Sequence, residues 1–145
     1  MLPDVSPAAV ERRNLRTVER WVALYNTDVA RMVHKCYHPE CVVDIKGGIT
    51  FQGHETFIAI ELGVERVAPR RRSRVVHAVA AGDTVAVQAV LTDPDRGADW
   101  ESSFCAVLTF RDALIVRDES YLDLRVWPSP RLTRDQWVKL NVLER

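Results

Sequence analysis

The chain has 145 residues, of which 47% are hydrophobic and 28% charged, a composition typical of one globular domain with its own core. Twenty basic residues balance twenty acidic ones, so no overall field attracts nucleic acid or an anionic membrane surface. No apolar run approaches the roughly 20 residues of a membrane span, and the first residues lack the basic and apolar layout of a secretion signal.

The first half of the chain has the pattern of helices with a hairpin between them. Ser6 and Pro7 give a side-chain cap followed by proline in the first turn, which favours a helix start. Asp28 is placed to cap a second helix, and Gly47 and Gly48 mark a tight turn between two short strands. The expected elements are helices over about 7–25 and 28–37, strands over 41–45 and 49–53, and a third helix over about 55–67.

The second half has the pattern of longer strands followed by an extension. Gly82 and Asp83 mark the first turn between these strands. Thr133 and Gln136 stand at capping-box spacing, which predicts a helical C-terminal extension over residues 131–145. We expect this extension to pack on its own domain or on a partner subunit. The expected strands are 74–80, 84–92, 100–110 and 115–124.

This order of elements predicts an α+β fold in a single domain that spans residues 1–145. Because the strands follow one another with short connections, most of them should pair antiparallel. The sheet is expected to be strongly curved, with the helices of the N-terminal half covering its concave face.

The last expected strand, IVRDESYLDL at 115–124, carries polar residues on a mostly apolar face. Alternate side chains of a strand point to opposite faces, so the even positions from Val116 to Leu124 share one face with Asp118 and Ser120. Burial can raise the pKa of a carboxyl by up to ~3–5 units, and such a group can take or give a proton near neutral pH. Alternatively, Asp118 bonds Ser120, a tyrosine or a backbone amide and only fixes the strand.

Five segments, in this order and spacing, resemble the nuclear-transport-factor-2-like superfamily, which includes ketosteroid isomerases, limonene-epoxide hydrolases and SnoaL-like polyketide cyclases. They are VERWVALYNTD, CYHPECVVDI, FQGHETF, VAAGDTVAVQAVLTD and FCAVLTFRDALIVRDESYLDL, and they cover roughly residues 10–125. The resemblance implies a cone in which a bent sheet and three helices enclose an apolar, small-molecule pocket, and a homodimer formed through the sheet. It implies no particular reaction, because this fold hosts many.

The catalytic residues of two branches of the superfamily are not matched. Ketosteroid isomerases place a tyrosine donor, a base aspartate and a protonated aspartic acid where this chain has Trp21, Ile45 and Ala106. Asp44 is one residue from the base position and should therefore face the other side of its strand. The positions of the arginine, two aspartates, tyrosine and asparagine of limonene-epoxide hydrolases are occupied here by Ala89, Leu91, Ser120, Val43 and Ile45.

The SnoaL-like cyclases are the least contradicted branch. They use an aspartate near the end of the last strand as the acid/base for an aldol closure, and both Asp118 and Asp123 lie near that position. The resemblance does not choose between the two. Asp123 shares the other face of the strand with Arg117 and Tyr121, where we expect it to pair with an arginine at the sheet surface or in a dimer contact.

His77 is a third candidate for proton transfer, because histidine titrates near neutral pH. It lies between Val75 and Val79 on the expected inward face of its strand. A relay from His77 to Asp118 would have to bridge three strand steps, on the order of 14 Å at the usual spacing. The alternative is a core histidine whose hydrogen bonds are satisfied.

The remaining candidates are expected to line the pocket. Trp21 and Tyr25 lie on the first-helix stripe that faces the pocket in the superfamily, where they would offer an N–H, a hydroxyl and two rings. Glu61 interrupts the apolar stripe of the third helix, and Trp100 and Phe104 are expected to alternate inward along their strand. The expected substrate-binding residues are Trp21, Tyr25, Val43, Ile45, Glu61, Trp100, Phe104, Ser120 and Leu122.

No metal or cofactor is predicted. The stretch HKCYHPEC holds two histidines and two cysteines, but their side chains would point in different directions on a helix and the strand after it. Arg70, Arg71, Arg72 and Arg74 form a basic cluster that is more typical of a solvated turn than of an anion site. No phosphate-binding glycine loop or dinucleotide fingerprint is present. Three cysteines cannot all pair within one chain, which favours a reducing, cytoplasmic location.

We therefore expect a cofactor-independent SnoaL-like enzyme that binds a small hydrophobic or polyketide-like molecule and cyclises, isomerises or dehydrates it. Asp118 would be the acid/base, and Ser120, His77 and Tyr25 would orient the substrate. The alternative is a non-catalytic ligand-binding or assembly module of the same fold. An open cavity in front of Asp118, with a second polar group in reach, would favour the enzyme, whereas a filled cone or a partner that neutralises Asp118 would favour the module.

Overall fold

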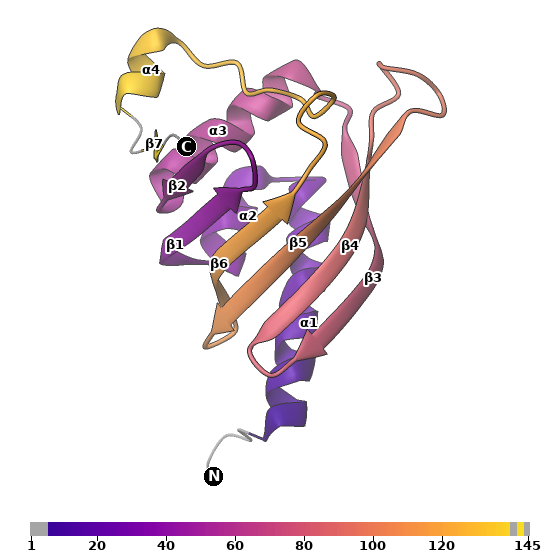
Figure 1. Ribbon diagram of the computed structural model, residues 1–145, viewed down its shortest axis with the longest axis vertical. Coiled ribbons are helices and arrows are strands. Elements are labelled where there is room, and N and C mark those ends of the chain that lie inside the picture. The colour runs from indigo at the N-terminus through magenta and orange to yellow at the C-terminus, as the bar shows by residue number, and fades with distance from the viewer. Residues whose placement is uncertain (1–5, 140–141, 144–145) are drawn as a thin grey trace.

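The computed structural model describes residues 6–139 and 142–143 and has the α+β architecture that the sequence predicts (Figure 1). No described helix is long and apolar enough to cross a membrane. The elements are α1 (Pro7–Tyr25), α2 (Val29–Cys36), β1 (Tyr37–Ile45), β2 (Thr50–Gln52), α3 (His54–Val67), β3 (Arg72–Ala81), β4 (Thr84–Thr92), β5 (Glu101–Arg111), β6 (Leu114–Tyr121), α4 (Arg134–Lys139) and β7 (Val142–Leu143).

The first two helices begin where the sequence signals predict. Ser6 caps α1, because its Oγ accepts a hydrogen bond from the Ala9 N–H at 3.2 Å, and Pro7 fills the first helical position. Asp28 caps α2 in the same way, accepting from the Arg31 N–H at 3.0 Å. These caps satisfy backbone N–H groups that have no partner within the helix.

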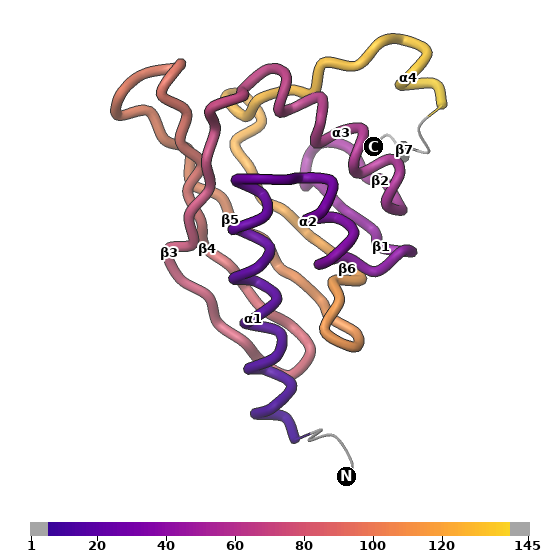
Figure 2. Tube along the Cα trace, turned by 180° about the vertical axis from the view of Figure 1, so that it is seen from behind, coloured from indigo at the N-terminus to yellow at the C-terminus, as the bar shows by residue number. Residues whose placement is uncertain are grey.

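The strands form one curved, mixed sheet in the order β3-β4-β5-β6-β1-β2-β7. Neighbouring strands are antiparallel except β1 and β6, which run parallel. Because β1 pairs with both β2 and β6, the β1–β2 hairpin from the first half of the chain lies beside the last long strand of the second half. Figures 1 and 2 show α1, α2 and α3 on the same, concave face, which leaves the outer face of the sheet without a helix among the described residues.

The core lies between these three helices and the concave face. It includes Val18 of α1, Met32 of α2, and Leu108 and Ile115 of the central strands, each no more than 2% exposed. Burying one such side chain contributes about 1.5–3 kcal/mol. Cys36 and Cys41 are also buried, and all three cysteines are free thiols.

The prediction that His77 faces inward is wrong. The pairing of β3 with β4 shifts register between Val75 and His77, and a shift of one residue moves the following side chains to the other face. His77 is therefore exposed on the outer side of the sheet, and Val79 is 52% exposed.

A second register shift explains a partial error in the alternation along β6. The pairing of β5 with β6 shifts between Thr109 and Phe110, and Ile115 is fully buried although strict alternation places it on the wetter face. Beyond this shift the alternation holds, and Asp118 and Ser120 are buried on the predicted face.

The C-terminal extension is less helical than predicted. The capping box is present: the Gln136 N–H donates to Thr133 Oγ1 at 3.1 Å, and the Thr133 N–H donates to Gln136 Oε1 at 2.8 Å. However, α4 ends at Lys139, and β7 pairs antiparallel with β2, because the edge of β2 offers backbone groups that a strand can satisfy. Residues 140–141 and 144–145 of the predicted helix lie outside the described residues.

Residues 122–133, here called the strap, leave the end of β6 and run along α3 (Figure 1). The close approach depends on Gly63, whose carbonyl accepts a hydrogen bond from the Arg131 N–H at 3.2 Å. A Cβ at this position would lie 3.0 Å from Pro130 Cβ and 3.2 Å from Arg131 N. Glycine is therefore needed here for space.

We expect Gly63→Ala to displace the strap from α3. Alanine favours the helix by roughly 0.5–1 kcal/mol over glycine, but crowding of this kind typically costs about 1–3 kcal/mol. Trypsin should cleave after Arg131 faster in the variant than in the wild type, while Glu65→Ala on the exposed side of α3 should leave the cleavage rate unchanged. Equal cleavage rates for Gly63→Ala and the wild type would contradict the packing described.

Candidate functional site

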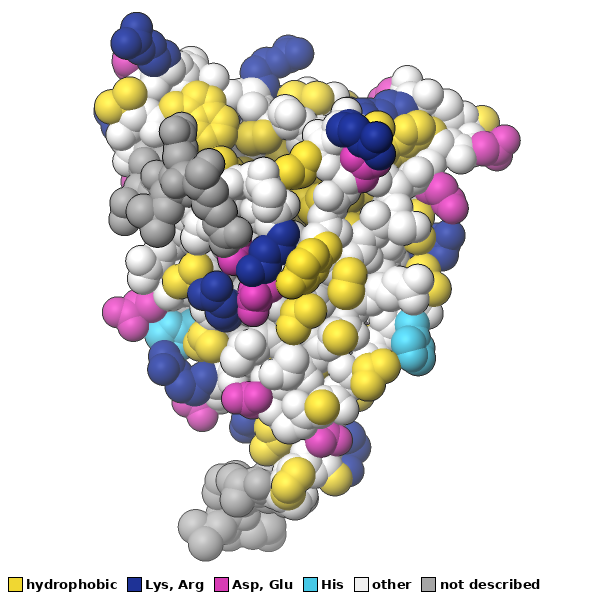
Figure 3. Space-filling model, in the orientation of Figure 1, with side chains coloured by type: hydrophobic (Ala, Val, Ile, Leu, Met, Phe, Trp, Pro, Cys, Tyr) yellow, Lys and Arg dark blue, Asp and Glu magenta, His cyan; other side chains and the backbone are white. Residues whose placement is uncertain are grey.

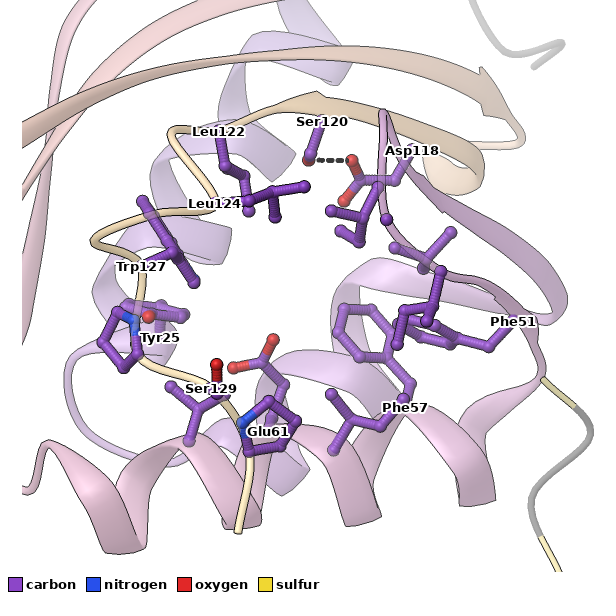
Figure 4. Close-up of a pocket in the computed structure, with 18 of the residues that line it drawn as sticks. Tyr25, Phe51, Phe57, Glu61, Asp118, Ser120, Leu122, Leu124, Trp127 and Ser129 are labelled. Carbon is purple, nitrogen blue, oxygen red and sulfur yellow. Dashed lines mark hydrogen bonds between the residues drawn. The ribbon is translucent and has the colours of Figure 1, made fainter. Parts of the chain in front are cut away.

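A cavity of about 320 Å³ lies between the concave face of the sheet, α1, α3 and the strap (Figure 4). This volume is at the small end of the range for ligand pockets, roughly 300–1,000 Å³. Most of its wall is aliphatic or aromatic. The lining residues are Trp21, Tyr25, Met32, Tyr37, Val43, Ile45, Gly48, Ile49, Phe51, Phe57, Ile60, Glu61, Val64, Asp118, Ser120, Leu122, Leu124, Trp127, Pro128, Ser129, Pro130 and Trp137.

A chain of hydrogen bonds holds Asp118 in this wall. The Tyr37 hydroxyl donates to Asp118 Oδ2 at 2.6 Å, and the Ser120 hydroxyl donates to Oδ1 at 2.6 Å. Trp21 Nε1–H in turn donates to the Tyr37 hydroxyl oxygen at 3.0 Å. Side chains from α1, β1 and β6 thus fix the orientation of one carboxyl group.

The environment shifts the ionisation of this group. Burial raises the pKa of Asp118 above its usual value, while the hydrogen bonds from Ser120 and Tyr37 act in the opposite direction. Burial and the neighbouring carboxylate raise the pKa of Tyr37 well above its usual value, so Tyr37 stays a neutral donor. Among the described residues, no Lys, Arg or His forms an ion pair with Asp118.

Glu61 is the second carboxyl of the cavity. It projects from α3, on the opposite side of the cavity from Asp118 and Ser120 (Figure 4). Its Oε2 atom is shielded from solvent and has no hydrogen-bond partner among the described residues. Burial raises the pKa of Glu61 to about 7, the charge of Arg71 lowers it, and the charge of Asp118 raises it.

The cluster of arginines predicts a solvated turn, but Arg71 is buried. Its Nε–H donates to the Tyr25 hydroxyl oxygen at 3.1 Å, and its guanidinium lies 4.7 Å from the centre of the Tyr25 ring. Burial raises the pKa of Tyr25, which keeps its hydroxyl neutral. Since the oxygen accepts from Arg71, the hydroxyl hydrogen remains able to donate.

Most of the residues predicted to form the site do lie at the cavity. Their positions follow from the periodicities of a helix and a strand, which place Trp21 with Tyr25, Val43 with Ile45, and Asp118 with Ser120 on one face. The predicted residues that line the cavity are Trp21, Tyr25, Val43, Ile45, Glu61, Asp118, Ser120 and Leu122.

Trp100 and Phe104 do not line the cavity. Phe104 packs edge to face against Trp127 at 5.0 Å between ring centres, and therefore supports the wall from behind. Trp100 lies just before β5, with the Arg96 guanidinium 4.9 Å from its ring centre. Arg96 and Trp100 both belong to the loop between β4 and β5, whose position relative to the pocket could not be predicted from the sequence.

His77 and Asp123 also lie away from the cavity. Asp123 is paired with Arg125, whose Nε lies 3.0 Å from Asp123 Oδ1, as expected for a surface carboxylate beside an arginine. Asp44 faces the outer side of β1, as predicted, and contacts Lys46 at 2.9 Å and Arg117 at 3.4 Å. Asp118 is thus the candidate aspartate that reaches the cavity.

Sequence reasoning missed Tyr37 and the contribution of the strap. Tyr37 was assigned to the end of the second helix, whereas it is the first residue of β1 and its side chain reaches Asp118. The signal was available in part, because a tyrosine next to a buried helix end often finds a polar partner inside. Trp127 lines the cavity from an irregular segment that has no periodicity to reveal its direction.

The described residues that line the cavity assemble no set of metal ligands. Across residues 6–139 and 142–143, no group of three His, Cys, Asp or Glu side chains is placed to hold a metal ion. The arrangement can bind an apolar molecule and offers two carboxyl groups, two tyrosines and two serines to its polar atoms.

Comparison with known proteins places the sequence and the fold. A family model described as SnoaL-like domain matches residues 18–118. No protein with curated annotation matches the sequence significantly. Among solved structures, a protein from Jannaschia sp. CCS1 named for its resemblance to SnoaL-like polyketide cyclases superposes with a TM-score of 0.72 at 21% identity, covering 86% of this chain and 93% of that chain.

Two further structures share the fold at similar distance. A Catenulispora acidiphila protein with a ketosteroid isomerase-like fold, solved in complex with trimethylamine, has a TM-score of 0.67 at 19% identity over 77% of this chain and 88% of that chain. Bal32a from a soil-derived mobile gene cassette has a TM-score of 0.69 at 18% identity over 82% of this chain and 96% of that chain. At these identities the likeness establishes the fold alone.

We expect Tyr37→Phe to raise the pKa of Asp118, because the variant loses a donor that favours the carboxylate but keeps the buried ring. Carboxyl-detected ¹³C NMR over a pH series, with Asp118→Asn to assign the resonance, measures the shift. Tyr121→Phe, at a tyrosine that is 50% exposed, is the matched control and should leave the pKa of Asp118 unchanged. An unchanged pKa in Tyr37→Phe would show that the hydroxyl does not stabilise the carboxylate.

Proposed function

The chain belongs to the SnoaL-like domain family, and from this premise we propose that its pocket binds a small, mainly hydrophobic molecule and that Asp118 moves a proton at a carbon atom of that molecule. Cyclisation by aldol closure, isomerisation and dehydration all include such a step, usually at a carbon next to a carbonyl. Polyketide-like molecules carry carbons of this kind, and the proposed chemistry uses no cofactor.

The observation that carries the proposal is an open cavity in front of a buried carboxyl group. Asp118 is 4% exposed, yet it lines about 320 Å³ of space that a ligand can occupy. A bound apolar molecule would displace water from this space. The basicity of the carboxylate would then increase, because its ionised form loses hydration.

The hydrogen bonds of Asp118 support a role as a positioned base. A carboxylate offers about four acceptor positions, and Tyr37 and Ser120 occupy one on each oxygen. The plane of the group is therefore fixed, and acceptor positions remain for a substrate proton. Fixed geometry of this kind removes part of the entropic cost of bringing base and substrate together.

The alternative is a non-catalytic ligand-binding module, and one observation favours it. Both oxygens of Asp118 already accept a short hydrogen bond within the protein. In such a ligand-binding module, Asp118 would only join β6 to β1 through these hydrogen bonds, and the cavity would bind a molecule without changing it. The two functions differ in whether proton exchange accompanies binding.

We expect the protein to accelerate the exchange of hydrogen for deuterium at the carbons next to the carbonyl of β-tetralone, a fused bicyclic ketone, in D₂O followed by proton NMR. Asp118→Asn should reduce the catalysed exchange rate by about 10²–10⁴-fold, the usual contribution of a general base. Asp123→Asn, which removes a surface carboxylate paired with Arg125, should leave the rate unchanged.

Two results would count against the proposal. Saturable binding of β-tetralone without accelerated exchange would support the ligand-binding module instead. Exchange that persists in Asp118→Asn and is lost in Asp123→Asn would move the chemistry to the surface carboxylate.

We further propose that two copies associate through the outer face of the sheet, in the cytoplasm, where the free cysteines would stay reduced. Figure 3 shows hydrophobic side chains among charged ones on this face. Val76, Val79 and Tyr121, all in strands of this sheet, are each about half exposed.

We expect Tyr121→Glu to shift the monomer–dimer equilibrium toward monomer, because it places a second negative charge beside Glu119 in the proposed contact. Sedimentation velocity over a concentration series measures the change. Glu40→Gln, at an exposed residue of β1, serves as the control. A wild-type protein that remains monomeric throughout the series would contradict the proposed dimer.

A further inference from the structure

Glu61 differs from the other polar groups that line the cavity. The hydroxyl of Tyr37 and both oxygens of Asp118 take part in hydrogen bonds within the protein. Within the part of the chain that the structure describes, Glu61 Oε2 is shielded from solvent and has no hydrogen-bond partner, while the side chain faces the cavity across from Asp118 (Figure 4). A shielded carboxyl oxygen without a partner costs free energy in the unliganded protein. A ligand that supplies a partner recovers that free energy.

The groups around Glu61 do not supply this partner. The charge of Arg71 acts on Glu61, but its Nε–H donates to the Tyr25 hydroxyl oxygen at 3.1 Å and its Nη1 donates to the Ala68 carbonyl at 3.4 Å. Its Nη2 is buried and, like Glu61 Oε2, has no hydrogen-bond partner among the described residues, so a polar ligand atom could contact both groups. No ion pair joins Arg71 to Glu61 within the described part of the chain. The titratable or charged groups that act on Glu61, or on which it acts, are Arg71, Asp118, Glu65, Tyr25 and Tyr37.

We propose that Glu61 is a second acid of this site, which donates its carboxyl proton to an oxygen atom of a ligand bound between Glu61 and Asp118. The inference rests on the proposed function and narrows its substrate class. The ligand is an apolar molecule with a carbonyl oxygen at the α3 side of the cavity and an acidic carbon at the β6 side.

The ionisation of the two carboxyls fits this division of roles. Glu61, with a pKa of about 7, carries its proton in a large fraction of molecules at neutral pH and can donate it. Burial raises the pKa of Asp118, while its two hydroxyl donors act against this by favouring the charged form, so the carboxylate can be present and accept a proton. Two carboxyls in different environments commonly divide the acid and base roles in this way.

The proton balance closes without another reactant. Asp118 carboxylate takes a proton from the carbon, the C–H electron pair becomes the carbon–carbon π bond of an enol, and the carbonyl π pair takes the proton of Glu61 to form an O–H bond. Where the ligand carries a second carbon–carbon double bond conjugated with the enol, a second step follows in which Asp118 returns its proton to the far carbon of the dienol. The π bonds then shift to leave one carbon–carbon double bond, the carbonyl re-forms, and Glu61 carboxylate takes back the proton from oxygen. The net change is an isomerisation, and both carboxyls end in their starting states.

A different ligand chemistry would use the same carboxyl in its ionised form. An amine cation would pair with Glu61 carboxylate and with the aromatic wall. This reading predicts the opposite pH dependence, because an amine selects the ionised form of Glu61, whereas a carbonyl oxygen selects the protonated form. The two ligand chemistries can therefore be told apart by the direction in which a bound ligand shifts the pKa of Glu61.

The test follows the carboxyl ¹³C resonance of Glu61 over a pH series, with Glu61→Gln to assign it, in the free protein and with three probes of one shape. The probes are β-tetralone, the hydrocarbon tetralin and the amine β-aminotetralin. Saturating β-tetralone should raise the pKa of Glu61, because binding favours the protonated form, and tetralin should raise it less. The affinity for β-tetralone should accordingly fall as the pH rises through about 7.

Variants separate the hydrogen bond from the shape of the site. Glu61→Gln keeps an N–H donor and should bind β-tetralone with nearly constant affinity across the pH series. Glu61→Leu has no donor and should bind β-tetralone about tenfold more weakly, the equivalent of one lost hydrogen bond, with little change for tetralin. Glu55→Gln removes an exposed carboxylate in the first turn of α3 that is not among the groups acting on Glu61, and should behave as the wild type.

The outcomes distinguish this inference from the function on which it rests. A pKa of Glu61 that is unchanged or lowered by β-tetralone overturns the proton-donor role, even if Asp118 still catalyses exchange. A pKa that rises in the absence of catalysed exchange supports Glu61 as a ligand-binding group and overturns the catalytic function alone. Binding of β-aminotetralin alone overturns the inference in favour of a cation site, and failure of every probe to bind overturns both.

Discussion

The structure depends on the burial of the Asp118 carboxyl group in a mostly apolar cone. Leaving Asp118 without partners there would cost several kcal/mol, and no cation is paired with it among residues 6–139 and 142–143. The hydroxyls of Tyr37 and Ser120 stabilise it instead, and Trp21 orients Tyr37. Because these donors come from α1, β1 and β6, the carboxyl can be held only when helix and sheet are assembled together. The same requirement sets the shape of the cavity.

Periodicity predicted the cavity wall wherever elements are regular. The spacing of Trp21 and Tyr25 on α1, and the alternation that pairs Asp118 with Ser120, needed only the geometry of one helix and one strand. His77 could not be placed in this way, because a register shift in β3 reverses the faces, and nothing local in the sequence marks the shift. The hydrogen-bond and charge partners of the site residues were even harder to predict from the sequence.

Two further examples show why hydrogen-bond partners cannot be predicted from local sequence patterns. Arg71 stands in a run of arginines that looks solvated, yet it is buried against Tyr25, 46 residues earlier in the chain. Tyr37 finds its acceptor 81 residues later. A hydrogen bond between distant segments is decided by the tertiary fold, and one sequence holds no record of which distant residues meet. The residues that could be predicted from the sequence are therefore those of the cavity wall. The hydrogen-bond network that controls the ionisation of Asp118 became visible only in the structure.

The parallel pairing of β1 with β6 has a consequence for how the protein acquires this site. Residues of β1 such as Tyr37 pair with residues of β6 such as Ile115, so a long loop must close before the pair can form. Loop closure over such separations slows folding relative to local hairpins such as β3–β4. A nascent chain on the ribosome can form the helices and the first hairpin, but the cavity cannot exist until β6 has been synthesised and docked beside β1. The hydrogen bonds that hold Asp118 are therefore absent from every nascent chain that has not yet reached the end of β6.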